Sequence, residues 1–115
     1  SQIGGEAAEG TIIGSVFNPY IERLEVGNFA AGFSKAYQRE PDRYAALGYD
    51  SVKLLAAALK NSDLKDRPTV AEELMSLGNW PGVTGIHKFN SSGDDIGELV
   101  VLKKLLNGKF EYIDK

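Results

Sequence analysis

Residues 44–60 read YAALGYDSVKLLAAALK, and the pattern of this stretch predicts a long helix. Its apolar and small residues recur every three or four positions, which is the spacing of one face of an α-helix. They are Tyr44, Leu47, Gly48, Ser51, Val52, Leu55, Ala58 and Leu59. Asp42 precedes the stretch and can cap free backbone N–H groups of the first turn. We therefore expect a helix ending near Lys60, with this stripe forming the core of the unit.

A strand and another helix are predicted on the amino-terminal side. Residues 10–17 combine β-branched and aromatic side chains and are stopped by Asn18-Pro19, which is typical of a mostly buried strand. Apolar residues recur at helical spacing from Val26 to about Arg39, and Pro41 ends this helix because proline disfavours a helical residue before it. The aromatic residues of the helix, Phe29, Phe33 and Tyr37, are expected in the core.

Shorter elements are predicted after the central helix. A short helix ends at Leu77, where Gly78 can take the left-handed conformation. Apolar residues then recur at nearly every second position, so residues 83–89 predict one strand. Residues 90–93 predict a turn.

A hairpin is predicted at the carboxy-terminal end. Residues 99–105 form a further predicted strand, and Asn107-Gly108 is a favoured pair for a tight turn into residues 109–113. The predicted order is one strand, three helices and three strands with a carboxy-terminal hairpin. We therefore expect an α/β fold in which residues 1–115 form a single unit.

The composition of the chain argues against several classes of function. The chain has 115 residues, 43% hydrophobic and 25% charged, which suits one globular domain. Lys and Arg total 13 against 16 for Asp and Glu, so no basic surface for nucleic acid is expected. With no cysteine, disulfides, thiolate nucleophiles and thiolate zinc sites are excluded. The first residues carry no export signal, so the signal of an exported protein would lie upstream.

Enzymatic chemistry has little support in the sequence. His87 is the only histidine, and no carboxylate stands at short metal-ligand spacing from it, so we expect a solvent-facing side chain on a strand. Residues 90–95 are rich in oxygen ligands but lack the spacing of a calcium loop, and a plain turn is expected. No serine lies in a nucleophile elbow. We predict no catalytic residue, no metal and no cofactor.

Tyr44 is the one side chain that suggests a binding site. It lies in the first turn of the central helix, directly after the loop of residues 40–42. An amphipathic ring at that place can line a cleft. The alternative, a tyrosine that seals the core at the end of the helix, fits the same residues equally well.

Five stretches of the sequence occur in an order that is typical of one family. They are residues 9–13 (EGTII), Phe29-x-x-x-Phe33-x-x-x-Tyr37, residues 41–59, Gly82-Val83-Thr84-Gly85-x-x-x-Phe89-x-x-x-Gly93-Asp94, and Asn107–Phe110. This order resembles the last part of the extracytoplasmic solute-binding receptors of branched-chain amino acid ABC transporters, which have the type I periplasmic-binding-protein fold. The resemblance covers nearly the whole chain.

The resemblance implies a binding protein rather than an enzyme. Receptors of this family have two α/β lobes joined by crossing segments, and a small ligand is trapped when the lobes close. The chain would be a carboxy-terminal fragment, with residues 10–89 mainly in the first lobe and residues 90–115 returning to the second. The implied partners are a branched-chain amino acid or similar small molecule and the transporter permease, and the implied location is periplasmic or extracytoplasmic.

The resemblance also assigns candidate ligand-binding residues. Tyr44 matches an aromatic residue that walls the ligand cleft on the first-lobe side, and Phe17, Asn18 and Tyr20 match a loop near the hinge. In the family, the ligand's carboxylate and ammonium groups are held by regions that this sequence does not contain. The chain alone is therefore expected to bind ligand poorly.

Two further expectations concern the state of the chain. Sheet edges and apolar helix faces that a complete receptor would cover tend to pair, so we predict a homodimer or another homo-oligomer. The alternative to a receptor fragment is a complete small regulatory or protein-interaction domain that holds its partner on the hairpin or on an exposed helix face.

Overall fold

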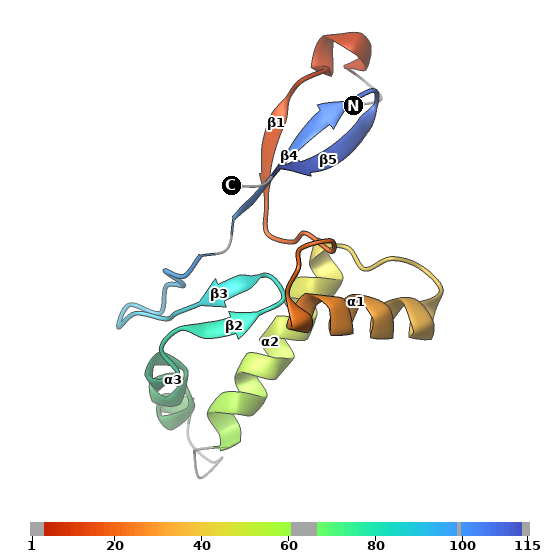
Figure 1. Cartoon of the computed structure of the whole chain (residues 1–115). Coiled ribbons are helices and arrows are strands. Elements are labelled where there is room, and N and C mark those ends of the chain that lie inside the picture. Colours follow the sequence, from red (N-terminus) through yellow and green to blue (C-terminus); the bar gives the residue numbers. More distant parts are fainter. Residues whose placement is uncertain (1–3, 61–66, 99, 114–115) are drawn as a thin grey trace.

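The computed structural model describes residues 4–60, 67–98 and 100–113 of the chain, and it is an α/β structure (Figure 1). Its elements in chain order are η1 (Gly5–Ala8), β1 (Ile12–Ser15), α1 (Leu24–Tyr37), α2 (Arg43–Lys60), α3 (Arg67–Ser76), β2 (Trp80–Gly82), β3 (Gly85–His87), β4 (Val101–Leu106) and β5 (Lys109–Ile113). Among the described residues, no helix is both long enough and apolar enough to cross a bilayer.

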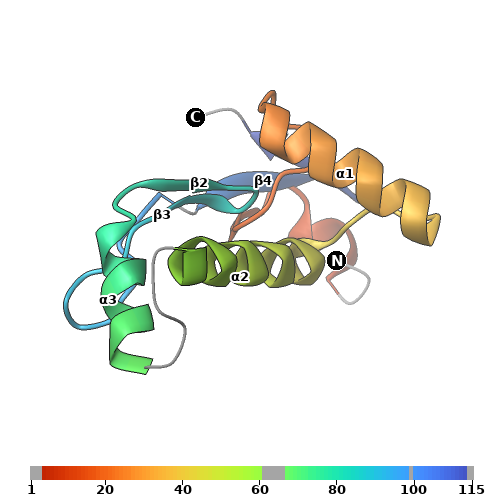
Figure 2. The same ribbon diagram turned by 90° about the horizontal axis from the view of Figure 1, so that it is seen from below.

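The strands form two separate antiparallel sheets. One has the order β1-β4-β5, with Ile13 opposite Lys103 and Lys103 opposite Tyr112. The other is the hairpin β2-β3. The three-stranded sheet projects from the part of the molecule that holds the helices and the β2-β3 hairpin (Figure 1). Seen from below, α3 lies across the carboxy-terminal end of α2 (Figure 2). The fold thus has two parts joined by the segments after β1 and after β3.

The hydrophobic core lies where α1, α2 and the β2-β3 turn meet. Its buried members are Phe17, Val26, Phe29, Ala46 and Val83. Phe17 and Phe29 meet edge to face with ring centroids 5.8 Å apart, which is a favourable geometry for aromatic pairs. The prediction that Phe29 is a core residue is confirmed.

Two predictions of burial were wrong. Tyr37 at the end of α1 is 62% exposed and only covers the ring of Phe33. In β1, predicted to be mostly buried, Ile12 and Ile13 are exposed, because among the described residues only β4 pairs with this outer strand and no helix covers it.

The extent of α2 is confirmed, but its predicted inward face was wrong. The buried positions are spaced by four residues and are Ala46, Asp50, Leu54 and Ala58. Of the predicted stripe only Ala58 is among them, whereas Val52 is 69% exposed. The helix takes this rotation because the Asp50 carboxylate accepts hydrogen bonds from the backbone N–H groups of the β2-β3 turn. A buried carboxylate with such partners decides which side of the helix faces inward.

The strand predicted over residues 83–89 is confirmed only at Gly85–His87, where β3 forms the second strand of a hairpin. β2 and β3 are joined by a two-residue turn at Val83 and Thr84, and Gly85 follows with a φ of 116°. This turn is possible because Asp50 satisfies the N–H groups of both turn residues and because glycine accepts a positive φ. The described part of the chain therefore has four strands after the helices, where three were predicted.

The carboxy-terminal hairpin is confirmed. β4 and β5 are connected by Asn107 and Gly108, both with positive φ, as the favoured two-residue turn requires. β4 begins at Val101, and residue 99, where the strand was predicted to start, lies outside the described residues. Residues 61–66 lie outside them as well.

Candidate functional site

A hollow of about 260 Å³ lies between the start of α2 and the sheet β1-β4-β5. Two of the predicted site residues, Phe17 and Tyr44, line it. The other lining residues are Ser15, Pro41, Asp42, Arg43, Lys103 and Tyr112. The hollow is therefore built by the loop before α2, by β1 and the residues just after it, and by the two strands of the carboxy-terminal hairpin.

Tyr44 is held at the mouth of this hollow by local interactions. Pro41 ends the preceding segment, and the Asp42 carboxylate accepts a hydrogen bond of 2.8 Å from the N–H of Ala45, which confirms the predicted cap. The guanidinium of Arg43 lies 4.8 Å from the centre of the Tyr44 ring and donates to its hydroxyl at 2.8 Å. Tyr44 is 67% exposed, so it does not seal the core. Its ring is therefore accessible to a molecule that enters the hollow.

The three other predicted site residues are distributed differently. Phe17 is only 2% exposed and forms the apolar base of the hollow as well as part of the core. Tyr20 lies beside Tyr112, with the two rings 6.0 Å apart, but it does not line the hollow. Asn18 accepts a hydrogen bond from the N–H of Tyr20 and lines a smaller cavity of about 50 Å³. The structure thus brings Phe17 and Tyr44 together, sets Tyr20 next to them and separates Asn18.

Tyr20, Glu40 and Tyr112 connect the two parts of the molecule. The hydroxyl of Tyr20 donates to both oxygens of the Glu40 carboxylate, at 3.1 and 3.2 Å. This hydrogen bond, together with smaller effects of burial and of the Glu40 charge, raises the pKa of Tyr20. Burial and the Glu40 charge also raise the pKa of Tyr112. Both phenols therefore remain neutral hydrogen-bond donors at neutral pH.

Six residues that line the hollow were not predicted as site residues, and three of them, Arg43, Lys103 and Tyr112, have long polar side chains. The signal for two of them was present, because the Asn107-Gly108 turn fixes a register that places Lys103 opposite Tyr112. What the sequence does not show is which face of this hairpin approaches the start of α2. Arg43 is next to Tyr44 in the chain and carried no separate signal.

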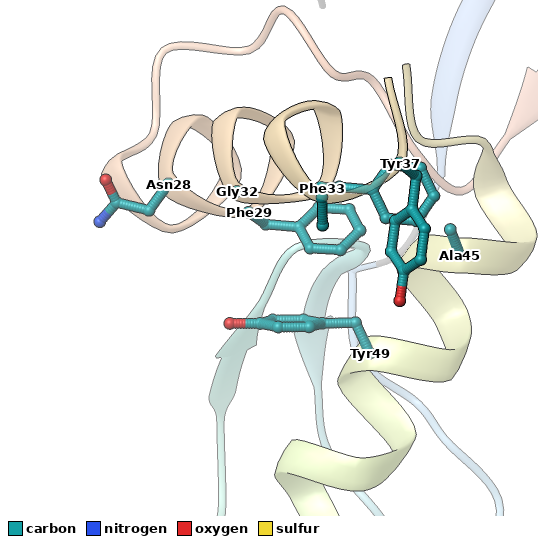
Figure 3. A pocket seen from close by; sticks show the side chains of 8 residues that line it. Asn28, Phe29, Gly32, Phe33, Tyr37, Ala45 and Tyr49 are labelled. Carbon is teal, nitrogen blue, oxygen red and sulfur yellow. The ribbon is translucent and has the colours of Figure 1, made fainter. Parts of the chain in front are cut away.

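A larger and mostly apolar hollow of about 480 Å³ opens between α1 and α2 (Figure 3). Aromatic rings dominate it, with Phe29 and Tyr49 4.6 Å apart and Phe33 and Tyr37 4.7 Å apart. Figure 3 shows the Tyr49 ring from α2 facing the rings of α1. It contains none of the predicted site residues. We therefore interpret this hollow as a gap in the packing of α1 against α2 and not as a binding site.

The prediction for His87 was wrong, because this side chain is buried. It is only 5% exposed at the end of β3, and it lies between two carboxylates. Its Nδ1 is 2.5 Å from Asp95 and its Nε2 is 3.1 Å from Asp50. Asp50 is 37 positions away in the chain, so sequence spacing gave no indication of the pair. Within the described ranges, no group of three or more His, Cys, Asp or Glu side chains is arranged to hold a metal ion.

Comparison with known families identifies the class of protein. The family model described as periplasmic binding protein matches residues 1–97. The chain therefore belongs to the periplasmic binding proteins. No curated protein matches it.

Solved structures similar to this chain include substrate-binding proteins of ABC transporters. One from Desulfitobacterium hafniense, in complex with Leu, is 47% identical with a TM-score of 0.87 and aligns to 98% of this chain and 34% of its own. The leucine-binding protein LivK from Thermotoga maritima is 31% identical with a TM-score of 0.80, over 98% and 32%. LivJ from Streptococcus pneumoniae, in complex with isoleucine, is 28% identical with a TM-score of 0.75, over 94% and 31%. The chain spans about a third of the length of these proteins, and the predicted fold and family are confirmed.

Proposed function

We propose that this chain is part of an extracytoplasmic receptor that binds a branched-chain amino acid and delivers it to the permease of an ABC transporter. The observation that carries the proposal is the 47% identity, over nearly the whole chain, to a substrate-binding protein solved with Leu. A role in binding rather than in catalysis agrees with that relationship. The proposal places the protein outside the cytoplasm.

The two-part structure supports a hinge mechanism. The hollow lies between the start of α2, which carries Tyr44, and the sheet that carries Lys103 and Tyr112. In our proposal these are parts of two lobes, and residues 10–89 belong mainly to the first. A ligand that contacts both lobes binds the closed form more tightly and therefore shifts the equilibrium towards it. Phe17 and Tyr44 would provide apolar surface for an aliphatic side chain.

The proposal is tested by leucine binding to the product of the complete gene, measured by titration calorimetry. Tyr44→Ala removes an aromatic wall, and we expect it to weaken leucine binding by about tenfold to a hundredfold, the value of roughly 1.4–3 kcal/mol of lost apolar contact. Tyr44→Phe should bind nearly as well as the wild type, because the ring is kept. Tyr37→Ala is the matched control, since Tyr37 is about equally exposed and lies on the other hollow.

Two outcomes would contradict this proposal. One is the absence of leucine binding by the complete gene product. The other is micromolar leucine binding by residues 1–115 alone, which would mean that the cleft does not need a second set of polar ligands. An unchanged leucine affinity of Tyr44→Ala would show that Tyr44 does not bind the ligand, but it would not contradict the proposed function.

We also propose that the isolated chain forms a homodimer or a larger homo-oligomer. Val52 and Leu55 are exposed on α2, and β1 and β5 are the outer strands of their sheet. Light scattering should give a mass above that of one chain. The double variant Val52→Glu/Leu55→Glu should lower the mass if the helix face pairs, whereas Lys35→Glu on the exposed side of α1 should not. A wild-type mass equal to one chain would refute this prediction.

A further inference from the structure

His87 is part of a chain of short contacts between α2 and the segment that follows β3. The Thr84 hydroxyl oxygen is 2.5 Å from Asp50 Oδ2 and 2.7 Å from His87 Nε2. At the other side of the ring, His87 Nδ1 is 2.5 Å from Asp95 Oδ2. Asp50, Thr84 and His87 are all buried. The proposed receptor function does not use these groups.

These three contacts require three protons between their heavy atoms. A threonine hydroxyl supplies one proton, a neutral imidazole supplies one, and ionised carboxylates supply none. If only these two protons are present, one of the three contacts has no proton, and two acceptor atoms then face each other at 2.7 Å or less. The arrangement is satisfied when the Thr84 hydroxyl donates to Asp50 and both ring nitrogens of His87 carry protons. The longer contact from Nε2 to Asp50 then shares the same N–H.

We propose that His87 is a proton-dependent clasp, which as an imidazolium holds Asp50 of α2 and Asp95 of the segment 94–97 together and on losing its proton releases that segment. The proposal does not depend on the proposed function. It assigns a conformational role to the only histidine of the chain.

The contacts of the two carboxylates show which side is released. Asp50 keeps three other donors, the N–H groups of Val83 and Thr84 and the Thr84 hydroxyl, and it is 1% exposed. Asp95 keeps two other donors, the N–H groups of Lys88 and Gly97, but its side chain is 21% exposed. When one proton is missing, the more exposed carboxylate moves away at lower cost. The segment that carries Asp95 is therefore the part that detaches.

The segment held by the clasp lies directly before the passage to the three-stranded sheet. It pairs with β3 and its flanks, since the N–H of Ile96 donates to the Lys88 carbonyl at 2.7 Å and the N–H of Ile86 donates to the Glu98 carbonyl at 2.9 Å. After this pairing the chain leaves for β4, at Val101. Opening the clasp therefore loosens one of the two connections between the parts of the molecule.

The pH range of the clasp has an acid limit, which Asp95 sets. Partial burial disfavours the charge on Asp95, but hydrogen bonds from His87, Lys88 N–H and Gly97 N–H outweigh it and lower the pKa of Asp95. A carboxylate with a lowered pKa stabilises the fold above its unfolded pKa of about 4, and this contribution is lost as the pH falls through the lower folded value.

The surroundings of His87 contain few other charges that could produce this behaviour. Asp50 from α2 and Asp95 from the segment after β3 are the ionisable groups in contact with the ring among the residues the structure describes. β2 contributes Trp80, with its ring 6.1 Å from the imidazole. The side chain of Lys88, the next residue, is exposed.

Nitrogen-15 NMR of the chain labelled only at histidine tests the proposal, because a single residue gives the signals. At pH 7.5 we expect both ring nitrogens to carry protons, as the proton count of the three contacts requires. As the pH is raised and one proton is lost, hydrogen exchange of the Ile96 amide should accelerate by about tenfold or more. A ring nitrogen without a proton at pH 7.5 overturns the proposal, and so does proton loss without faster exchange at Ile96.

Two variants at neighbouring positions provide a second test of the proposal. Asp95→Asn keeps the shape but removes the charge facing Nδ1, so His87 should lose its second proton by pH 7.5 and the Ile96 amide should exchange faster. Asp94→Asn is the matched control in the same turn, with an exposed side chain, and should change neither signal. Equal behaviour of the two variants overturns the proposal. The wild-type measurement decides the protonation state even if Asp95→Asn does not fold.

Discussion

Asp50→Ala is expected to lower the free energy of unfolding by about 3–4 kcal/mol, which is the largest effect of any single substitution we predict. The carboxylate is 1% exposed and accepts hydrogen bonds from Val83 N–H at 2.9 Å and from Thr84 N–H at 2.8 Å. Removing it leaves both N–H groups buried without an acceptor. It also removes one of the two carboxylates that face His87. The β2-β3 turn then loses its hydrogen bonds to α2.

Urea unfolding followed by the fluorescence of Trp80 measures this effect, since Trp80 is the only tryptophan and lies in β2. Asp42→Ala is the matched control. Asp42 also accepts a backbone N–H, but at an exposed helix start, so its loss should cost only about 1 kcal/mol. Asp50→Asn, which keeps one acceptor oxygen, should fall between the two. If Asp50→Ala costs no more than Asp42→Ala, the Asp50 contacts do not stabilise the fold.

The sequence was most informative where the causes of structure are local. The start of α2 follows from Pro41 and the cap at Asp42, and the β4-β5 hairpin follows from Asn107-Gly108, because these residues act on their immediate neighbours. The inward face of α2 was not predicted, because it depends on hydrogen bonds between Asp50 and a turn more than 30 positions away. An aspartate on a helix is normally assigned to solvent, and only its partners bring it inside.

The same distinction applies to the candidate site. Tyr44 could be chosen as a candidate because its place at the start of a helix, after a proline loop, is visible in the sequence. Lys103 and Tyr112 reach the same hollow through the arrangement of the whole sheet against α2, which no local pattern specifies. His87 was misassigned for the same reason, since one of its carboxylate partners comes from a different element and the other from beyond a turn.

Gly97→Ala is the second substitution with a large expected effect, and it acts through the backbone. A Cβ at this position would overlap the carbonyl oxygen of Ile86 and would lie 2.7 Å from the carbonyl carbon and 3.0 Å from the Cα of His87. These are main-chain atoms of β3, so no side chain can turn aside to make room. The segment has to move away from β3, which breaks the pairing of Ile86 with Glu98. We expect a loss of about 2–4 kcal/mol in the free energy of unfolding.

Gly32→Ala is the control for this second prediction, because it makes the same chemical change where nothing is close. Gly32 lies on α1, and a Cβ there meets no atom within 4 Å. Alanine favours the helix over glycine, so this variant should gain about 0.5–1 kcal/mol. The two glycines should therefore differ in sign as well as in size in the same urea experiment. A Gly97→Ala protein as stable as Gly32→Ala would show that the segment after β3 does not lie against Ile86 in solution, and the clasp at His87 would then have nothing to hold.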